Sequence, residues 1–586
     1  MDGIPTIDGH HHDGLYHSVV HDGSSVIDAG LVTSLLAICC LIIVFFTFNL
    51  FDDKHLDQLL TLPSERYVEI VVPENEETYP YRVFKSSSIR PPNVTVTGNG
   101  DQVADGLLFL TPKGRGKKGV NQTAPFAFDS DGELVFAANA SYGVNDFNAQ
   151  TYHGRPYLTF WQGKSTGNPT PGHGFGELVF LSDTYEEFSI DLHADINGTW
   201  AVDTPKKPGL PPGVIDFHEH SMTDQNRLLV TAFNNTPANL TSVGGPGDGW
   251  VSNSMFFEID VRTGNITYQW SPLEHIPLNT SNMPVESYMG SGTQDAPWDF
   301  FHTNSVQAVG TEYFLISSRH MWSVYLISRH TGEVVSEFNG ETGGEFGPVP
   351  EGGNFRWQHH ARAHDVTSTG FYLSLFDNHA MKEDPDSKPS RGLMFYFALP
   401  MQAKKAPKLI GQYTVEGDEF MAPSQGSFHA DLPPTDAQLV GYGQFPVARE
   451  FGRDGTLRWE ARYGYHDYVS SYRAFKHPWH ATPGSWDPSL VIEPVNGEEW
   501  SDGPQDFNAY VSWNGATDVQ SWDVFAVENP DLQRRHGDHE GRYLGHAKRA
   551  GFETTLQVQL LGEECLRVEA VQDGKRVRAS NIACRP

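Results

Sequence analysis

Short apolar runs separated by turn residues dominate the chain from about residue 78 onward. Typical runs are GLLFL at 106–110, ELVFA at 133–137 and YFLIS at 313–317. Runs of this length predict β-strands, and the Thr-Gly and Asp-Gly steps between many of them predict hairpins. Hardly any segment after residue 60 keeps a helical period for three turns. The pattern therefore predicts an all-β fold.

One motif recurs along these strands: a histidine that stands shortly before an apolar strand. It occurs at His218, His302, His359 and His429, at intervals of 84, 57 and 70 residues. Irregular units of about 60–70 residues with several antiparallel strands are typical of propeller blades. We expect a six-bladed β-propeller over residues 96–475, in which the histidines meet at one face of the central channel.

The pattern changes after residue 475. A linker at 476–490 precedes alternating strands within 491–586, which predict a small β-sandwich of the immunoglobulin or fibronectin III kind. Cys565 and Cys584 are the pair left for a disulfide, because Cys39 and Cys40 lie in an apolar run. The four cysteines contain no C-x-x-C spacing, so no zinc-ribbon or redox motif is expected.

The N-terminal region has a different character. Residues 31–51 form a stretch of 21 residues without a charge, long enough to span a bilayer as a helix. The stretch starts too deep in the chain for an ordinary cleaved signal peptide. We predict a transmembrane signal anchor at 31–51, a disordered cytosolic tail at 1–30, and a stem that leads into the propeller at 52–95.

Two signals disagree about the orientation of the anchor. No lysine or arginine precedes Lys54, which weakly favours a cytosolic C-terminal side, although long domains translocate largely regardless of such charges. Eight N-x-[ST] sequons follow the anchor and favour a luminal or extracellular body. Asn234 is the sequon least expected to be used, because it stands where other repeats carry a channel residue. The predicted glycosylation sites are Asn93, Asn121, Asn139, Asn197, Asn239, Asn265 and Asn279.

The recurring histidines and Arg319 form a candidate site. A neutral histidine can act as a nucleophile, a base or a metal ligand. The planar guanidinium of Arg319 suits sulfate, phosphate or carboxylate, and it disfavours a cation in the same cluster. The net charge of −32 argues against nucleic acid or anionic lipid as a partner. These residues indicate a site for a small anionic substrate.

Several distinctive segments are spread over roughly residues 80–475. They read YHGRPYLTFWQG, GHGFGELVFL, DFHEHSMT, DFFHTNSV, ISSRH, RWQHHAR and SLFDNHA. These segments resemble the arylsulfotransferase family, in particular its eukaryotic and largely fungal branch. The resemblance implies a six-bladed propeller that transfers a sulfuryl group from an aryl sulfate to a phenol through a sulfated histidine. It implies no cofactor and no nucleotide donor of the PAPS kind.

The resemblance assigns roles to individual residues of this chain. The nucleophile falls on His359, and the residues that stabilise the transferring group fall on His302, Arg319 and His218. His360 directly follows His359, so the nucleophile could be either of these two histidines. His220 lies two residues after His218, so the role given to His218 could also belong to His220. No metal ligand is expected. The residues expected to bind substrate are His360, Arg362, Asn378, His429 and His320.

Two other classes of function stay open at this stage. One is a membrane-tethered propeller that binds an anionic, sulfated ligand without turning it over. The other is a histidine-ligated metal enzyme. Covalent labelling of a histidine would indicate the sulfotransferase, binding that depends on Arg319 would indicate the binding protein, and stoichiometric metal would indicate the metal enzyme.

Overall fold

A computed structural model describes residues 61–585 apart from nine gaps. The gaps are 75–76, 99–101, 115–117, 168–171, 193–212, 382–383, 496–502, 529–540 and 563. The predicted tail and membrane anchor at 1–51 therefore lie outside the described residues. Across the described ranges, no helix is both long enough and apolar enough to cross a membrane. The compact unit Leu62–Pro586 contains the described elements.

The prediction of an all-β chain is confirmed. Strands follow one another along the described chain, and α3 (Pro272–His275) is a single helical turn. The predicted Thr-Gly and Asp-Gly hairpin steps have a common physical basis: Gly264, Gly332 and Gly455 have φ values of 69°, 75° and 84°. A tight turn needs this left-handed conformation, which glycine adopts without a steric penalty.

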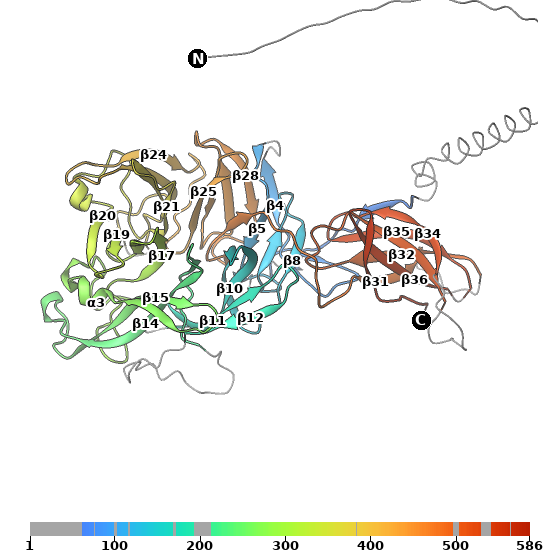
Figure 1. Ribbon diagram of the computed structural model, residues 1–586, viewed down its shortest axis with the longest axis horizontal. Coiled ribbons are helices and arrows are strands. Elements are labelled where there is room, and N and C mark those ends of the chain that lie inside the picture. The colour runs from blue at the N-terminus through green and yellow to red at the C-terminus, as the bar shows by residue number, and fades with distance from the viewer. Residues whose placement is uncertain are drawn as a thin grey trace, which may run out of the picture. The chain divides into compact units, whose positions relative to one another are not determined.

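Four antiparallel sheets are each built from four consecutive strands. In Figure 1 their colours pass from cyan through green to yellow in chain order. The first sheet is β9 (Gly143–Tyr152), β10 (Arg155–Ser165), β11 (Gly174–Leu181) and β12 (Glu187–Ile190). The second is β13 (His220–Met222), β14 (Arg227–Ala238), β15 (Gly249–Asp260) and β16 (Ile266–Trp270). The third is β17 (Thr303–Val309), β18 (Tyr313–Ser318), β19 (Ser323–Ser328) and β20 (Val334–Asn339). The fourth is β21 (His359–His364), β22 (Gly370–Asp377), β23 (Arg391–Ala398) and β24 (Lys408–Tyr413).

Two further sheets combine segments that are far apart in the sequence. The fifth adds β4 (Thr95–Gly98) to β25 (Ser427–Leu432), β26 (Ala437–Gly441), β27 (Val447–Phe451) and β28 (Leu457–Arg462). The sixth joins β30 (Phe475–His477) to β5 (Leu107–Leu110), β7 (Phe126–Phe128) and β8 (Leu134–Ala137). The register pairs Arg462 with Thr95 and Phe475 with Phe109. Both ends of this region are thus held in sheets.

The six sheets pack against one another through apolar clusters. The cluster between the third and fourth sheets, for example, places the ring of Phe338 against those of Phe395 and Phe397. The first strands β9, β13, β17, β21 and β25 contact one another in this order, and β30 contacts both β25 and β9. The starts of these strands therefore lie close together, and they carry most of the candidate site residues.

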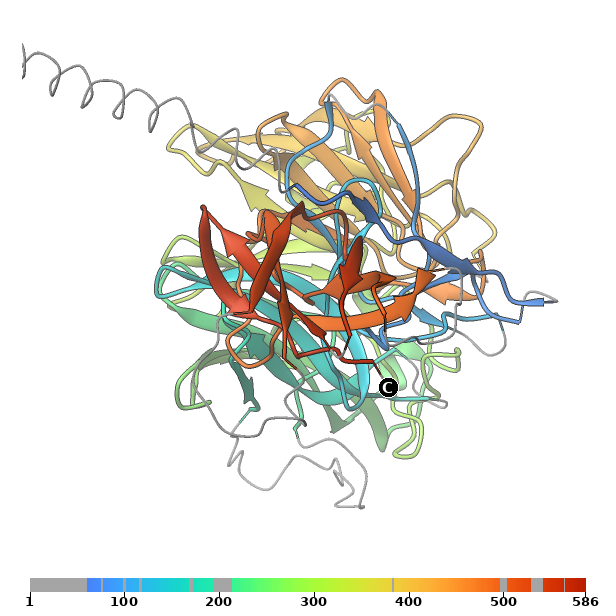
Figure 2. The ribbon, with the colours of Figure 1, turned by 90° about the vertical axis from the view of Figure 1, so that its right-hand side faces the viewer.

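The C-terminal strands form two further sheets, coloured orange to red in Figures 1 and 2. One contains β31 (Ser489–Pro494), β32 (Gln505–Ser512), β35 (Glu553–Leu560) and the N-terminal strand β1 (Ser64–Arg66). The other contains β33 (Ser521–Val527), β34 (Arg542–Lys548), β36 (Cys565–Gln572) and β37 (Lys575–Ala579). Side chains of both sheets share one hydrophobic cluster around Trp513 and Trp522.

Two expectations bear on this C-terminal region. The predicted disulfide between Cys565 and Cys584 is confirmed. The segment 52–95, expected to be a stem, supplies β1 to a C-terminal sheet and ends at Thr95, the first residue of β4 in the fifth sheet. Short polar strands such as β1 (Ser64–Arg66) carry no apolar alternation, so only their partner strands determine where they pair.

Candidate functional site

A cavity of about 660 Å³ lies at the starts of the first strands. The four residues predicted to be catalytic, His218, His302, Arg319 and His359, all line it. Each of these residues is at most 4% exposed. The rest of the wall is largely apolar or uncharged: Ser165, Gly172, Phe217, Tyr288, Met289, Met381, Pro423, Ser424, Gln425, Gln444 and Tyr472, with Lys113 as a second cation.

A β-bulge separates His359 from its neighbour His360. Along β21 the register advances three residues, from His359 to Arg362, while the partner strand advances only two. His360 is left-handed, with φ of 56°. A bulge re-aims side chains, so the strict in-out alternation of a strand is lost here. His359 consequently lines the cavity, whereas Nδ1 of His360 lies 3.1 Å from the Phe428 carbonyl oxygen, outside the cavity wall.

The hydrogen bonds of His359 fix its tautomer. Its Nδ1–H donates to Oδ1 of Asn378 at 2.7 Å, while the amide of Asn378 donates to the carbonyls of Ala422 and Gln425. The Asn378 oxygen can therefore only accept. Burial, reinforced by the nearby charge of Arg319, holds the pKa of His359 well below its usual range. His359 is thus a neutral imidazole with its lone pair on Nε2.

A strained loop residue faces that lone pair. The backbone N–H of Gln425 lies 3.2 Å from Nε2 of His359 and donates to it. Gln425 has φ of 65°, a conformation that is uncommon for a residue with a side chain. Such backbone strain tends to occur at functional sites. When Nε2 forms a new bond, this N–H becomes free to donate to an oxygen of the attached group.

Two Asp–His dyads contribute His218 and His302 to the cavity wall. Asp216 accepts a hydrogen bond from Nδ1–H of His218, and Oδ2 of Asp299 lies 2.5 Å from Nδ1 of His302. The two imidazole rings lie 4.7 Å apart between centroids. Burial lowers the pKa of His302 to about 3 and also lowers that of His218, although the aspartates oppose the effect. Both histidines therefore present Nε2 with a free lone pair in the resting state.

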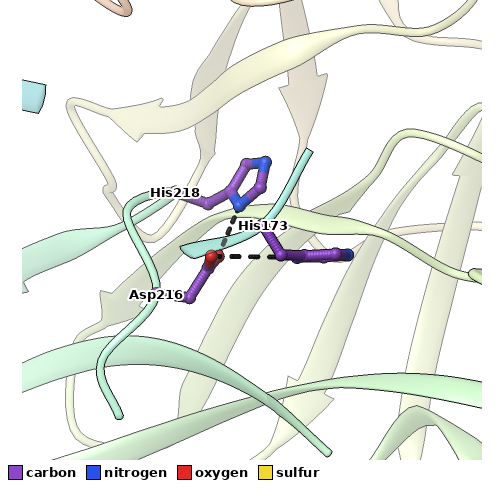
Figure 3. Close-up of side chains that lie close together, drawn as sticks. All are labelled: His173, Asp216 and His218. Atoms are coloured by element: carbon purple, nitrogen blue, oxygen red, sulfur yellow. Dashed lines mark hydrogen bonds and ion pairs between the residues drawn. The ribbon is translucent and has the colours of Figure 1, made fainter. Parts of the chain in front are cut away.

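A third histidine, His173, lies between the two carboxylates. Its Nε2 is 2.9 Å from Oδ2 of Asp299, and its Nδ1 is 3.8 Å from Oδ1 of Asp216. Figure 3 shows Asp216 between His173 and His218. Burial alone would lower the pKa of His173, but Asp299 and Asp216 outweigh it and raise the pKa to about 10. The cluster thus contains one imidazolium and two carboxylates.

Arg319 is held rigidly at the cavity wall. One guanidinium nitrogen donates to Nε2 of His320 at 3.0 Å and another donates to the Pro423 carbonyl at 2.8 Å. Its guanidinium lies 5.2 Å from the ring centroid of Trp357. Nε of Arg319 is buried without a hydrogen-bond partner. Because a guanidinium carries five N–H donors, Arg319 keeps donors available for an anion while its position is fixed.

The five residues expected to bind substrate are not in the cavity wall. His320 lies behind Arg319 and its Nδ1–H donates to the Asp299 carbonyl at 2.6 Å. Asn378 contacts His359, as described above. The guanidinium of Arg362 pairs with Glu219 at 2.6 Å, and the ring of His429 lies 4.7 Å from that of His477. Of the five, His320 and Asn378 thus contact the catalytic candidates Arg319 and His359 directly.

The alternative His220 also lies outside the wall. Its Nδ1 is 3.2 Å from Oδ2 of Asp146, and its Nε2 is 3.0 Å from Oγ1 of Thr159. Asp146 in turn pairs with Arg473 at 3.0 Å. His220 therefore belongs to a buried charge network next to the site, and His218 is the histidine of this segment that lines the cavity.

Sequence reasoning missed several residues of the site. Asp216 and Asp299 stand two and three residues before their histidines, in DFHEH and DFFH, so this short spacing was the available signal. Tyr472 gave no signal, although its ring lies 5.6 Å from that of His218 and its hydroxyl is buried without a partner. Gln425 comes from a loop, and its role depends on its backbone N–H.

Two overlapping groups of side chains have ligand atoms within 4.8 Å of one another, as a metal site requires. They are His173, Asp216 and His218, and His173, Asp299 and His302. In both groups the carboxylate already accepts an N–H from a histidine, and the guanidinium of Arg319 lines the same cavity. A bound cation would have to displace these bonds beside a fixed positive charge. The groups fit a hydrogen-bonded cluster better than a metal site.

Comparisons with known proteins give one informative match. The family model for arylsulfotransferases (ASST) matches residues 148–464. Solved structures with distant likeness include a protein of unknown function from Bacteroides caccae (8% identity, 64% of this chain and 100% of that chain, TM-score 0.34). Another is a family 43 arabinoxylan arabinofuranohydrolase from Bacillus subtilis (10% identity, 76% and 97%, TM-score 0.28).

TM-scores this low carry no argument about fold or function. The comparison with curated proteins gave no match. The family match spans 317 of the 586 residues and includes the dyad histidines, Arg319 and His359. The chain therefore belongs to the arylsulfotransferase (ASST) family.

Proposed function

We propose that this protein transfers a sulfuryl group from an aryl sulfate to a phenol through a sulfated His359. The observation that carries the proposal is the convergence of His218, His302, Arg319 and His359 on one cavity. The apolar and aromatic part of the wall suits the aryl rings of donor and acceptor. The reaction needs no nucleotide donor, because the aryl oxide of the donor is itself the leaving group. Membership of the eukaryotic branch of the family stays a prediction.

The first step forms a covalent intermediate. Nε2 of His359 attacks sulfur, a nitrogen–sulfur bond forms, and the bond between sulfur and the aryl oxygen breaks. When the anionic donor binds, its negative charge favours uptake of one proton from solvent by a dyad histidine. The Nε2–H of His218 or His302 then protonates the departing aryl oxide. The N–H of Gln425 and the guanidinium of Arg319 donate to the sulfuryl oxygens.

The second step reverses the proton transfer. The same dyad histidine, now neutral at Nε2, accepts the hydroxyl proton of the incoming phenol. The phenol oxygen attacks sulfur, and the bond between sulfur and Nε2 of His359 breaks. An Asp that accepts Nδ1–H and leaves Nε2 free is the arrangement by which other enzymes turn a histidine into an alternating base and acid. Protons and charge balance over the two steps.

We further infer that the region is a six-bladed β-propeller followed by a β-sandwich. Support for the propeller comes from the six sheets, the contacts between successive first strands, and the contact of β30 with β9. Support for the sandwich comes from the two C-terminal sheets that share one hydrophobic cluster. In a propeller the first strands line the channel, which explains why the site forms at their starts.

We also propose that the protein is a single-pass membrane protein whose body lies in the secretory pathway or outside the cell. The support is the uncharged stretch at 31–51, the sequons that follow it and the disulfide between Cys565 and Cys584. Disulfides persist in oxidising compartments. Of the predicted glycosylation sites, Asn93 is half-buried and Asn197 lies outside the described residues. The exposed sites are Asn121, Asn139, Asn239, Asn265 and Asn279.

The matched variants His359→Ala and His360→Ala test the enzymatic proposal. The first removes the nucleophile and should abolish release of the donor's phenol, including any single-turnover burst. The second removes an adjacent buried imidazole outside the cavity wall and should retain the burst. Wild-type kinetics with a nitrophenyl sulfate donor and a phenol acceptor should be ping-pong.

A chelator decides between this proposal and metal catalysis. It should leave the wild-type rate unchanged. Loss of activity with a chelator, together with activity in His359→Ala, would contradict the sulfated-histidine mechanism. Saturable binding of an aryl sulfate that depends on Arg319, with no cleavage by the wild type, would instead identify a binding protein.

A further inference from the structure

The segment Gly172–His173–Gly174 contacts both dyads, and the proposed reaction gives it no role. Gly172 has φ of 100°, and a Cβ there would lie 3.3 Å from Cε1 of His302. A Cβ on Gly174 would lie 2.7 Å from the ring of Phe217, the residue before His218. The N–H of Gly174 donates to Oδ1 of Asp216 at 2.7 Å. The two glycines let the backbone at His173 approach both dyads closely.

His173 itself is fully buried between the two dyads. Nε2–H donates to Oδ2 of Asp299 at 2.9 Å, the same oxygen that accepts from His302. Nδ1 has no hydrogen-bond partner and lies 3.8 Å from Oδ1 of Asp216. The ring packs 4.5 Å from that of Phe233. The imidazole is therefore placed between the two carboxylates and not in the cavity wall.

We propose that His173 is a shared positioning residue, which holds Asp216 and Asp299 so that each fixes the ring of its own histidine. The inference rests on the proposed function and goes beyond it, because one imidazole then links His218 and His302. His173 does not touch the substrate. It acts through the carboxylates on the direction in which two Nε2 atoms face the sulfuryl group.

Electrostatics explain why a histidine is needed at this position. Asp216 and Asp299 are 2% and 0% exposed, and two buried carboxylates this close to one imidazole repel each other. Removing a buried charge from its partner is strongly unfavourable. The raised pKa of His173 agrees with a cation between them. The two cations of the cavity wall have other partners: Arg319 donates to His320 and the Pro423 carbonyl, and Lys113 donates to Asn145. Without His173, one carboxylate must take up a proton or move, and its dyad histidine loses its orientation.

His173→Phe is the decisive variant, because it keeps an aromatic ring against Phe233 and removes both nitrogens. His364→Phe is the matched control: His364 is a half-buried histidine whose Nε2 lies 2.6 Å from Oγ of Ser374 and which does not line the cavity. The readout is the far-downfield proton resonances of the two dyad Nδ1–H groups. They are assigned by their loss in His218→Ala and His302→Ala, and melting temperatures verify folding.

We expect both dyad resonances to shift or disappear in His173→Phe and to remain in His364→Phe. The single-turnover release of phenol should fall roughly 10²-fold, the scale of a small misplacement of catalytic groups. His173→Gln keeps one neutral donor toward Asp299, so the His302 resonance should be retained better than that of His218. Adding Asp299→Asn to His173→Phe should slow release little further, because both changes act on one unit.

Unchanged resonances in folded His173→Phe would overturn the proposal and reduce His173 to a packing residue. If the phenylalanine variant does not fold, unchanged resonances in His173→Gln have the same meaning. The resonances do not depend on turnover. A wild type that cleaves no aryl sulfate would therefore contradict the proposed reaction, while the effect of His173 on the dyads would still be decided.

Discussion

The protonation pattern of three histidines determines what the cavity can do. His218, His302 and His359 each donate Nδ1–H to a buried acceptor, which places the lone pair of each ring on Nε2. The acceptors are Asp216, Asp299 and Asn378. The neutral amide partner of His359 adds no charge that would favour its protonation, which suits a nucleophile. The charged partners of the other two histidines suit residues that must take up and release a proton.

Arg319 contributes both charge and geometry, and two variants separate the contributions. The charge of Arg319 helps to lower the pKa of His359. As the pH is lowered, the rate should therefore begin to fall only at a pH well below about 6.5, the ordinary pKa of an imidazole. Arg319→Lys keeps the charge but loses the planar guanidinium with its paired N–H donors. It should slow phenol release without changing the pH at which the rate falls. Arg319→Met should slow phenol release and also make the rate fall at a higher pH, because protonation of His359 becomes easier.

The measurement is the pH dependence of single-turnover phenol release, with Arg262→Lys as the control on an exposed arginine. If the rate falls at the same acid pH in Arg319→Lys and in Arg319→Met, the charge of the arginine does not affect the protonation of His359. If Arg319→Lys releases phenol as fast as Arg262→Lys does, the planar geometry of the Arg319 guanidinium does not contribute to the rate.

At the residue scale, the sequence predicted which histidines line the cavity but not the partners that hold them. The recurrence of a histidine before a strand led to His218, His302 and His359. The choice between His359 and His360 depends on a bulge whose left-handed residue is His360, and nothing in the local sequence distinguishes it. The partner Asn378 is a strand away from His359, so only tertiary pairing brings the two together.

At the scale of elements, irregularities in the first strands build the site. β9, β17, β21 and β25 each contain a register shift, and left-handed residues such as His302 stand at or beside them. A bulge adds a residue to one strand and turns its side chain out of the regular alternation. The period-2 patterns therefore predicted the strands and the glycines of their hairpins, but they could not predict the directions in which the site residues point.

Long-range pairing was the second feature that local patterns did not predict. β30 (Phe475–His477) pairs with β5 across some 370 residues, with Phe475 opposite Phe109. β30 also carries a fully buried ion pair, between Nζ of Lys476 and Oε2 of Glu450 on β27, at 3.1 Å. Oε1 of Glu450 accepts the N–H of Ala104 at 2.6 Å. The pair thus links the C-terminal and N-terminal parts of the six-sheet region.

Breaking this pair tests its part in holding β30. Lys476→Met leaves the carboxylate of Glu450 buried and unpaired, so it should lower the free energy of unfolding by about 3–5 kcal/mol. The double variant with Glu450→Gln removes both charges and keeps an acceptor for Ala104, so it should recover most of the loss. Urea denaturation measures both values. A double variant no more stable than Lys476→Met would show that the charges themselves are not the reason for the loss.

At the scale of the whole molecule, the proposed compartment and orientation can be tested on the surface of the body. The net charge of −32 and the exposed sequons are features of the chain as a whole. Protein made in a secretory host should lose apparent mass on glycosidase treatment. Site mapping should find glycans on exposed asparagines such as Asn121 and Asn265, and none on Asn234, which is buried in β14. An unchanged mass, together with a reactive thiol at Cys565, would contradict the proposed orientation.

The sulfated state of His359 is the central claim, and mass spectrometry of the intact enzyme tests it most directly. Wild-type protein is mixed with an aryl sulfate in the absence of a phenol acceptor, quenched and digested. We predict one added SO₃ group per chain on the peptide that contains His359, lost again when phenol is supplied, and absent from His359→Ala. Rapid release of the donor's phenol with no modified histidine, or with the group on another residue, would contradict the account.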